Sequence, residues 1–198
     1  MSLRQRAHLK TSNHLRLFFA LWPEEHVRQQ LINYAQRLQS INSGRCVDAD
    51  NIHLTLRYIG MFSVKKIPAL EVFCEKIQSD SFVLQLQSVG LWSKPQVTWV
   101  APMLIPPALT CLQQQLDQVC QAQGVAADPQ PYQPHVTLIR KSKKLADDSP
   151  RLELLDWPVS SFVLVESRST QRGVSYEVLR EWELNKLASD SNDAFSQS

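Results

Sequence analysis

His53-Leu54-Thr55-Leu56-Arg57-Tyr58-Ile59-Gly60 has a counterpart later in the chain, His135-Val136-Thr137-Leu138-Ile139-Arg140, and both stretches begin with His-x-Thr-Leu. Apolar and polar residues alternate in both, which predicts two short strands. Side chains two positions apart lie on the same face of a strand, so each histidine shares a face with its threonine. The sequence therefore predicts two strands, each with an imidazole and a hydroxyl on its polar face.

The segments that follow the two motifs also correspond. A predicted hairpin at 82–89 and 97–100 follows the first motif, and another at 159–165 and 174–184 follows the second. Motifs and hairpins recur at an offset of about 80 residues, which is typical of an internal duplication. We therefore expect two similar lobes that face each other across a cleft, with one motif on each wall.

Further elements complete this plan. An apolar strand is predicted at 15–21, and amphipathic helices are predicted at 23–40, at 64–78 and from Pro106 to near Gly124. Gly60 is expected to end the strand of the first motif. Residues 1–13 are predicted to form a mobile extension and 188–198 an acidic, serine-rich disordered tail, which leaves 14–187 as a single domain.

Composition bounds the function only loosely. The chain has 198 residues, 43% of them hydrophobic, which suits one sizeable domain or two closely packed lobes. Lys+Arg 21 against Asp+Glu 19 gives a net charge of +2, so no global charge demands a nucleic-acid partner, although a local basic cleft remains open. The four cysteines lack the spacing of zinc sites or disulfide frameworks, and the N-terminal segment lacks an apolar core. We expect free thiols and a soluble cytoplasmic protein without membrane contact.

The paired motifs point to proton-transfer chemistry. Two imidazoles that face a common point can act as general base and general acid, as phosphate ester chemistry requires. Thr55 and Thr137 can donate hydrogen bonds to phosphoryl oxygens. Other chemistries fit less well, since the sequence contains no G-x-S-x-G elbow, no H-E-x-x-H motif and no glycine-rich nucleotide loop. No metal and no cofactor are predicted.

The sequence resembles a known family, the two-histidine phosphoesterases, and within it the RNA 2′,3′-cyclic phosphodiesterases once described as 2′-5′ RNA ligases. The resemblance is carried by the doubled H-x-T-L motif, the opening strand Arg16-Leu17-Phe18-Phe19-Ala20 and the closing pattern Tyr176-x-x-Leu179-x-x-Trp182. It implies a bilobal α+β fold with pseudo-twofold symmetry, two antiparallel sheets lining a central cleft, and helices on the outside. It also implies metal-independent hydrolysis of a terminal RNA 2′,3′-cyclic phosphate to a 2′-phosphomonoester.

The same resemblance implies roles for individual residues. His53 would protonate the departing 3′ oxygen and His135 would activate water, while Thr55 and Thr137 hold the phosphate and Arg140 neutralises its charge. Ideal alternation would place Arg140 on the face opposite His135, so the strand end must bend if the guanidinium is to reach phosphate. Otherwise Arg140 is a solvated arginine at the start of the basic loop 140–144.

Several assignments remain open. Arg57 has the parity of His53 and Thr55, so it either contacts phosphate or RNA or extends into solvent. Base stacking or ordinary core packing are both open for four aromatic residues, which are Phe18, Trp92, Trp99 and Tyr132. The expected partners are RNA ends or nucleotides with a 2′,3′-cyclic phosphate, bound by a monomer. The alternatives are 2′-5′ RNA ligation or its reversal, and a nucleotide- or RNA-binding module without turnover.

Overall fold

The two His-x-Thr-Leu strands lie at the centre of a curled antiparallel sheet in the computed structural model, which describes residues 13–171 and 173–186. The predicted tail, and the predicted extension up to residue 12, lie outside the described residues. The main spatial order of the nine-stranded sheet is β7 (Leu155–Val159), β4 (Phe82–Trp92), β5 (Val97–Pro102), β6 (Val136–Arg140), β3 (Leu54–Ser63), β1 (His14–Leu21), β8 (Ser161–Thr170) and β9 (Gly173–Glu183). The short strand β2 (Arg45–Cys46) pairs with β6.

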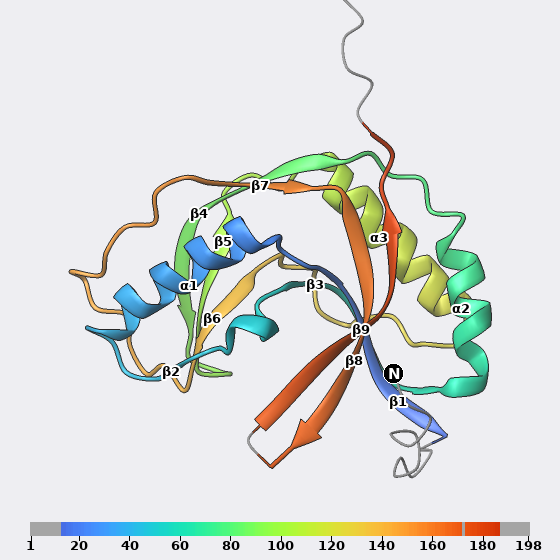
Figure 1. Ribbon diagram of the computed structural model, residues 1–198, viewed down its shortest axis with the longest axis horizontal. Helices are drawn as coiled ribbons and strands as arrows, with labels where there is room; N and C mark the ends of the chain where they lie inside the picture. Colours follow the sequence, from blue (N-terminus) through green and yellow to red (C-terminus); the bar gives the residue numbers. More distant parts are fainter. Residues whose placement is uncertain (1–12, 172, 187–198) are drawn as a thin grey trace, which may run out of the picture.

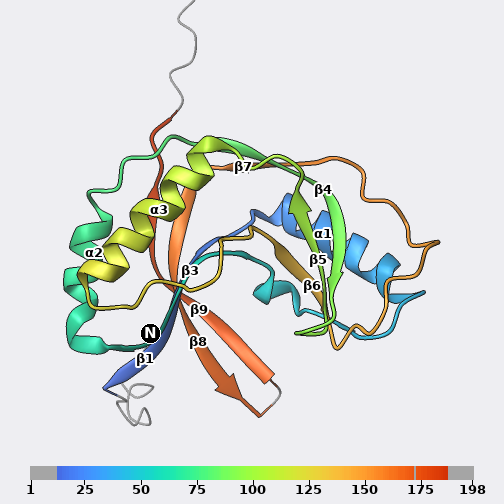
Figure 2. The ribbon, with the colours of Figure 1, turned by 180° about the vertical axis from the view of Figure 1, so that it is seen from behind.

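The sheet consists of two halves that meet at the two motifs. The described pairing of β3 with β6 is the residue pair Leu54↔Val136, one position after each histidine. Beyond this pair the two strands run apart, so the sheet curls into a half-barrel (Figures 1 and 2). The predicted α+β class and bilobal arrangement are confirmed, but the two expected sheets are joined here into one.

Each half of the sheet combines distant parts of the chain. We call β1, β3, β8 and β9 with the helices beside them the first lobe, and β2, β4, β5, β6 and β7 the second lobe. The hairpin β4–β5, which follows the first motif in sequence, pairs with the second motif's strand β6. Conversely, β8 follows the second motif and pairs with β1 beside the first. The duplication is therefore interleaved, because each motif's hairpin completes the other motif's lobe.

Helices cover the outer faces of both lobes, as Figure 1 shows. Helix α1 (Glu25–Gln39) packs against β2, β6 and β7, and α3 (Pro107–Ala122) packs against β3 and α2 (Ile67–Cys74). Short 3₁₀ turns, η2 (Ala49–Asn51) and η3 (Val64–Lys66), precede β3 and α2. The predicted helix 64–78 is thus shorter than expected. An α-helix from Val64 would need an N–H donor at Pro68, which proline lacks, so the helix begins with that proline in its first turn.

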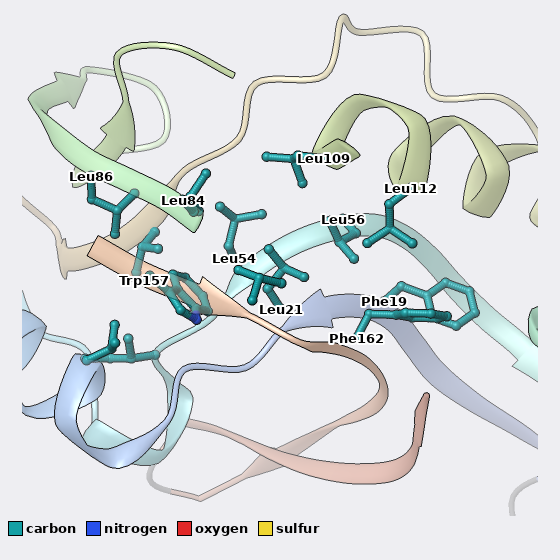
Figure 3. Packing of buried hydrophobic residues seen from close by; sticks show 14 of the residues in the cluster. Phe19, Leu21, Leu54, Leu56, Leu84, Leu86, Leu109, Leu112, Trp157 and Phe162 are labelled. Atoms are coloured by element: carbon teal, nitrogen blue, oxygen red, sulfur yellow. The ribbon is translucent and has the colours of Figure 1, made fainter. Parts of the chain in front are cut away.

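The core lies between the sheet and these helices. The leucines that alternate with histidine and threonine in the first motif, Leu54 and Leu56, are buried there, as are Val136 and Leu138 of the second. Figure 3 shows Leu54 and Leu56 among side chains from both lobes and from α3, with Leu21, Leu84, Leu109 and Trp157 nearby. Burial of these alternate residues leaves the intervening polar side chains on the opposite, concave face.

Two strand boundaries differ from the sequence-based expectations. Gly60 does not end its strand, since β3 continues to Ser63 and Gly60 adopts a φ of 81° beside a register shift against β1. A positive φ is readily accessible to glycine, which is why the strand can continue through a bulge there. From the sequence, no strand is predicted over 155–158, where β7 contains Pro158, and Val159 is assigned to the following strand. Strand β7 lies at the sheet edge, where a residue without an N–H donor is tolerated.

Candidate active site

The same local hydrogen bond orients both histidines. His53 Nδ1 lies 2.7 Å from the Asn51 carbonyl oxygen, and His135 Nδ1 lies 2.8 Å from the Gln133 carbonyl oxygen. In each case the acceptor is the carbonyl two residues earlier. A carbonyl oxygen only accepts, so Nδ1 must carry the proton and the neutral ring presents an unprotonated Nε2. The duplication thus gives both rings the same tautomer.

All five predicted site residues line one hollow between the lobes. His53 and Thr55 come from the first motif, and His135, Thr137 and Arg140 come from the second. We call this hollow, of about 220 Å³, the catalytic pocket. His53 Nε2 accepts a hydrogen bond of 3.1 Å from the Thr55 hydroxyl. The structure therefore brings together the residues that the motifs and the family resemblance predicted.

A β-bulge explains how Arg140 reaches this pocket. Thr98 pairs with Ile139 whereas Trp99 pairs with Thr137, so Leu138 is an extra residue in β6. The extra residue shifts the alternation by one position beyond it. Leu138 and Ile139 are consequently both buried, and Arg140 emerges on the same face as Thr137. The strand end bends as the resemblance required.

The matching bulge in the first motif has the opposite effect on Arg57. Phe19 pairs with Arg57 and Ala20 with Thr55, which makes Leu56 the extra residue. Arg57 is therefore turned towards the helices and is only 5% exposed, with Nε 2.6 Å from the Asp117 carboxylate. Its guanidinium also donates to the backbone carbonyls of Tyr58 and Ala126. Both expectations for Arg57, contact with phosphate and extension into solvent, are wrong because the strand alternation changes at Leu56.

Aromatic rings surround His53. Trp22 stacks on the imidazole with ring centroids 5.6 Å apart and an interplanar angle of 12°, and Phe18 and Tyr176 each lie 5.0 Å from it. Burial lowers the pKa of His53 to about 4, against the raising effect of the Asn51 carbonyl, and the nearby charges of Arg140 and His135 lower it further. His53 is thus neutral at neutral pH in the unliganded protein.

His135 is less enclosed. The Trp92 ring contacts it edge-on, with centroids 4.4 Å apart. Burial lowers the pKa of His135 below its usual value, the hydrogen bond to Gln133 raises it, and Arg140 lowers it. Arg140 lines the same pocket as both rings, where its positive charge can attract an anion.

Of the four aromatic candidates for base stacking, one lines the catalytic pocket and three do not. Trp92 lines the catalytic pocket, whereas Phe18 is buried behind His53. Tyr132 is tied by its hydroxyl to the Thr55 carbonyl oxygen at 3.3 Å, and Trp99 covers Gly90, where an added Cβ would meet its ring at 2.3 Å.

Sequence reasoning missed two aromatic contacts to His53, those of Trp22 and Tyr176. Tyr176 lines the catalytic pocket itself. Its place in the closing Tyr-x-x-Leu-x-x-Trp pattern was the signal available for it.

Comparison with known proteins agrees with this geometry. The sequence model of the family LigT like Phosphoesterase matches residues 21–99. The RNA 2′,3′-cyclic phosphodiesterase of Escherichia coli is 30% identical over 171 residues, which span 86% of this chain and 97% of that protein. The chain belongs to the LigT-like phosphoesterase family. The prediction of a two-histidine phosphoesterase is thereby confirmed.

More distant relatives and solved structures of this LigT-like phosphoesterase family extend the comparison. The RNA 2′,3′-cyclic phosphodiesterase of Thermus thermophilus is 26% identical, with 86% of this chain and 90% of that protein covered. Crystal structures of E. coli LigT with 3′-AMP and with NADP⁺ each give a TM-score of 0.80 at 30% identity. They cover 86% and 88% of this chain, and 98% and 99% of theirs.

Three further properties concern the described residues. None of their helices has the length and hydropathy to cross a membrane. Their histidine, cysteine and acidic side chains form no group of three that could hold a metal ion. The four cysteines are free thiols, as predicted, and burial raises the pKa values of Cys74 and Cys120 to about 12.

Proposed function

We propose that this LigT-like phosphoesterase hydrolyses the 2′,3′-cyclic phosphate at the end of an RNA and leaves a 2′-phosphomonoester. The observation that carries the proposal is the catalytic pocket itself, in which two histidines with the same tautomer share about 220 Å³ with two threonines and an arginine. Phosphodiester hydrolysis needs a base for water, an acid for the leaving oxygen and a cation for the phosphoryl oxygens. The pocket contains one group for each task.

The histidines divide the proton transfers. Nε2 of His135 takes a proton from water as the water oxygen bonds to phosphorus, and Nε2 of His53 gives a proton to the 3′ oxygen as its bond to phosphorus breaks. The Thr55 and Thr137 hydroxyls donate to the non-bridging oxygens, and Arg140 balances the charge that develops on them. This division follows the family resemblance.

The low pKa of His53 places a condition on this mechanism. At neutral pH the unliganded ring is neutral, so it must take up a proton when the substrate binds. A phosphate anion beside Nε2 favours the charged imidazolium and raises the pKa of the ring. Until then Nε2 accepts from the Thr55 hydroxyl, which becomes free to turn towards a phosphoryl oxygen once that ring nitrogen is protonated.

Two relatives support the substrate class. The E. coli and T. thermophilus proteins are named RNA 2′,3′-cyclic phosphodiesterases. E. coli LigT has been crystallised with 3′-AMP, a nucleotide with its phosphate at the ribose edge. A nucleotide-end phosphate is therefore the expected occupant of the catalytic pocket here as well.

The first experiment measures turnover of a short RNA that ends in a 2′,3′-cyclic phosphate, with the product identified as a 2′- or 3′-phosphate. Replacement of one catalytic histidine should lower kcat/KM by about 10²- to 10⁴-fold, the usual range for general acid or base catalysis. Arg180→Gln, a charge change on β9 where Arg180 faces Glu75, serves as the control for both histidine variants. Full activity of His53→Ala or His135→Ala, or a 3′-phosphate product, would contradict the mechanism.

A second experiment assigns the roles of the two histidines. In a 3′-deoxynucleoside 2′-(p-nitrophenyl phosphate), nitrophenolate replaces the 3′ oxygen as leaving group and departs without protonation. His53→Ala should then retain most of its activity on this ester while losing activity on the cyclic phosphate. His135→Ala should be impaired on both substrates. The reverse pattern would exchange the roles of acid and base.

A further inference from the structure

A larger basic groove adjoins the catalytic pocket. Its volume is about 620 Å³, and it shares four lining residues with the pocket, which are Val47, Asn51, Arg140 and Tyr176. A molecule bound in one hollow can therefore continue into the other without leaving the protein surface. We call this second hollow the basic groove.

Positive charge dominates the basic groove. Among the described residues that line it, the cations apart from Arg140 are Arg16 on β1, Arg45 on β2 and Lys141 after β6, and the one carboxylate is that of Asp48. Arg45 and Asp48 are 3.7 Å apart and both well exposed, so their ion pair is weak and leaves the guanidinium able to turn. These cations come from both lobes and surround one hollow, although the chain as a whole is nearly neutral.

The groove also offers aromatic surface and a defined wall. Tyr58, whose side chain is half exposed, and Tyr176 both line it. One wall is the outer part of the β8–β9 hairpin, which the Asn51 side chain ties to the η2 turn through a 2.9 Å hydrogen bond to the Val174 carbonyl oxygen. Single-stranded nucleic acid is typically bound by cationic side chains that contact its phosphates and by exposed aromatic rings that stack on its bases.

A third hollow, which also adjoins the catalytic pocket, is acidic instead of basic. It shares Thr55 with the pocket, but it is lined by the carboxyl groups of Asp117 and Asp128. Its arginine, Arg57, is already bound to Asp117. A phosphate chain that leaves the catalytic pocket on this side would meet negative charge, so electrostatics favour the basic groove as the path.

We propose that the basic groove binds the single-stranded RNA segment on the 5′ side of the reacting end, so that the protein prefers oligonucleotides to mononucleotides. The proposal rests on the proposed function, because it takes the cyclic phosphate to lie in the catalytic pocket. Arg16, Arg45 and Lys141 contact the phosphates of that segment, and Tyr58 stacks on a base. Arg140 stands where the two hollows meet and belongs to the reacting phosphate.

The test compares two substrates in one set of variants. Wild type, Arg16→Gln, Arg45→Gln, Lys141→Gln and the triple variant are assayed on a short RNA with a 2′,3′-cyclic end and on a nucleoside 2′,3′-cyclic monophosphate. Each phosphate contact on a single strand makes the logarithm of the binding constant fall by about 0.7 for each tenfold rise in salt concentration. One contact therefore contributes roughly fivefold in affinity at 0.1 M salt relative to 1 M. The RNA-to-mononucleotide ratio of kcat/KM should therefore fall about fivefold for each cation removed and roughly 100-fold in the triple variant.

A control variant tests whether the loss of a positive charge outside the groove changes the RNA-to-mononucleotide ratio. Arg180→Gln removes the same charge from β9, where Arg180 faces Glu75 at 3.5 Å outside the groove, and should leave the ratio unchanged. A triple variant that loses activity on both substrates equally would overturn the proposal, and so would one that loses none.

Fluorescence anisotropy with the same RNA bearing a 2′-phosphate measures binding without turnover. If the wild type hydrolyses neither substrate, the proposed function fails, and salt-dependent RNA binding that the triple variant lacks would still support the groove.

Discussion

Arg57 and Arg140 should show opposite phenotypes when each is replaced by methionine, which keeps the length of the side chain and removes its charge. The bulges at Leu56 and Leu138 turn Arg57 into the protein and Arg140 into the catalytic pocket. Strict strand alternation would predict the reverse. The pair of substitutions therefore tests the bulges directly.

The magnitude for Arg57→Met follows from its contacts. The substitution leaves the Asp117 carboxylate and the Ala126 carbonyl oxygen without their guanidinium partner. Loss of one partner from a buried ion pair costs roughly 3–5 kcal/mol, and the 26% exposure of Asp117 places this pair at the lower end. We expect a loss of about 3 kcal/mol in the free energy of unfolding and a Tm lower by roughly 6–12 °C for a chain of this size.

Arg140→Met should spare stability and impair catalysis. Arg140 is exposed at the end of β6, so the free energy of unfolding should change by no more than about 0.5 kcal/mol. Loss of one group that stabilises transition-state charge lowers kcat by about 10²- to 10³-fold. Because Arg140 lowers the pKa values of His53 and His135, both pKa values should also rise, which moves the pH profile of kcat/KM to higher pH.

Urea unfolding and initial rates on the cyclic-phosphate RNA measure both effects, at a temperature where each variant is folded. Asp117→Asn is the matched variant for the buried pair and should reproduce part of the instability of Arg57→Met. The reasoning would be refuted if Arg57→Met kept full stability but lost kcat, or if Arg140→Met unfolded as easily as Arg57→Met.

Two further predictions concern the surroundings of each histidine. The pKa of His53 falls from its ordinary 6.5 to about 4 on folding, so the unfolded chain binds more protons between these values. Stability should then be fully present above pH 6.5 and be lost as the pH falls towards 4, by roughly 2.5 kcal/mol between pH 7 and pH 4.5 in urea unfolding. The same measurement on His53→Gln should show a smaller loss of stability between pH 7 and pH 4.5. An equal loss would show that His53 is not its cause. Gly90→Ala should lower the free energy of unfolding by about 1–3 kcal/mol, since the new Cβ would meet the Trp99 ring at 2.3 Å. Trp99 packs on Trp92, and Trp92 contacts His135. If Gly90→Ala changed neither the free energy of unfolding nor kcat, the Trp99 ring would be able to move aside without cost, and this prediction would be wrong.

Local patterns in the sequence were sufficient to predict many of the strands and helices of the protein. Alternation around the two histidines predicted both strands and placed His53, Thr55, His135 and Thr137 on the concave face. Helical spacing predicted α1 and α3 to within a few residues. These elements bury one face against the core, and this burial sets the period at which apolar residues recur along the chain.

By itself, then, the sequence determined which residue types meet at the site and the duplication that supplies them, because both depend on short motifs of fixed spacing that recur along the chain. Only the tertiary structure decided which arginine faces the pocket, which hairpin completes which lobe, and where the basic groove lies. Each of these depends on pairing between strands distant in sequence. One extra residue opposite a neighbouring strand, at Leu56 and again at Leu138, exchanges the two faces for the residues that follow it, up to the next register shift.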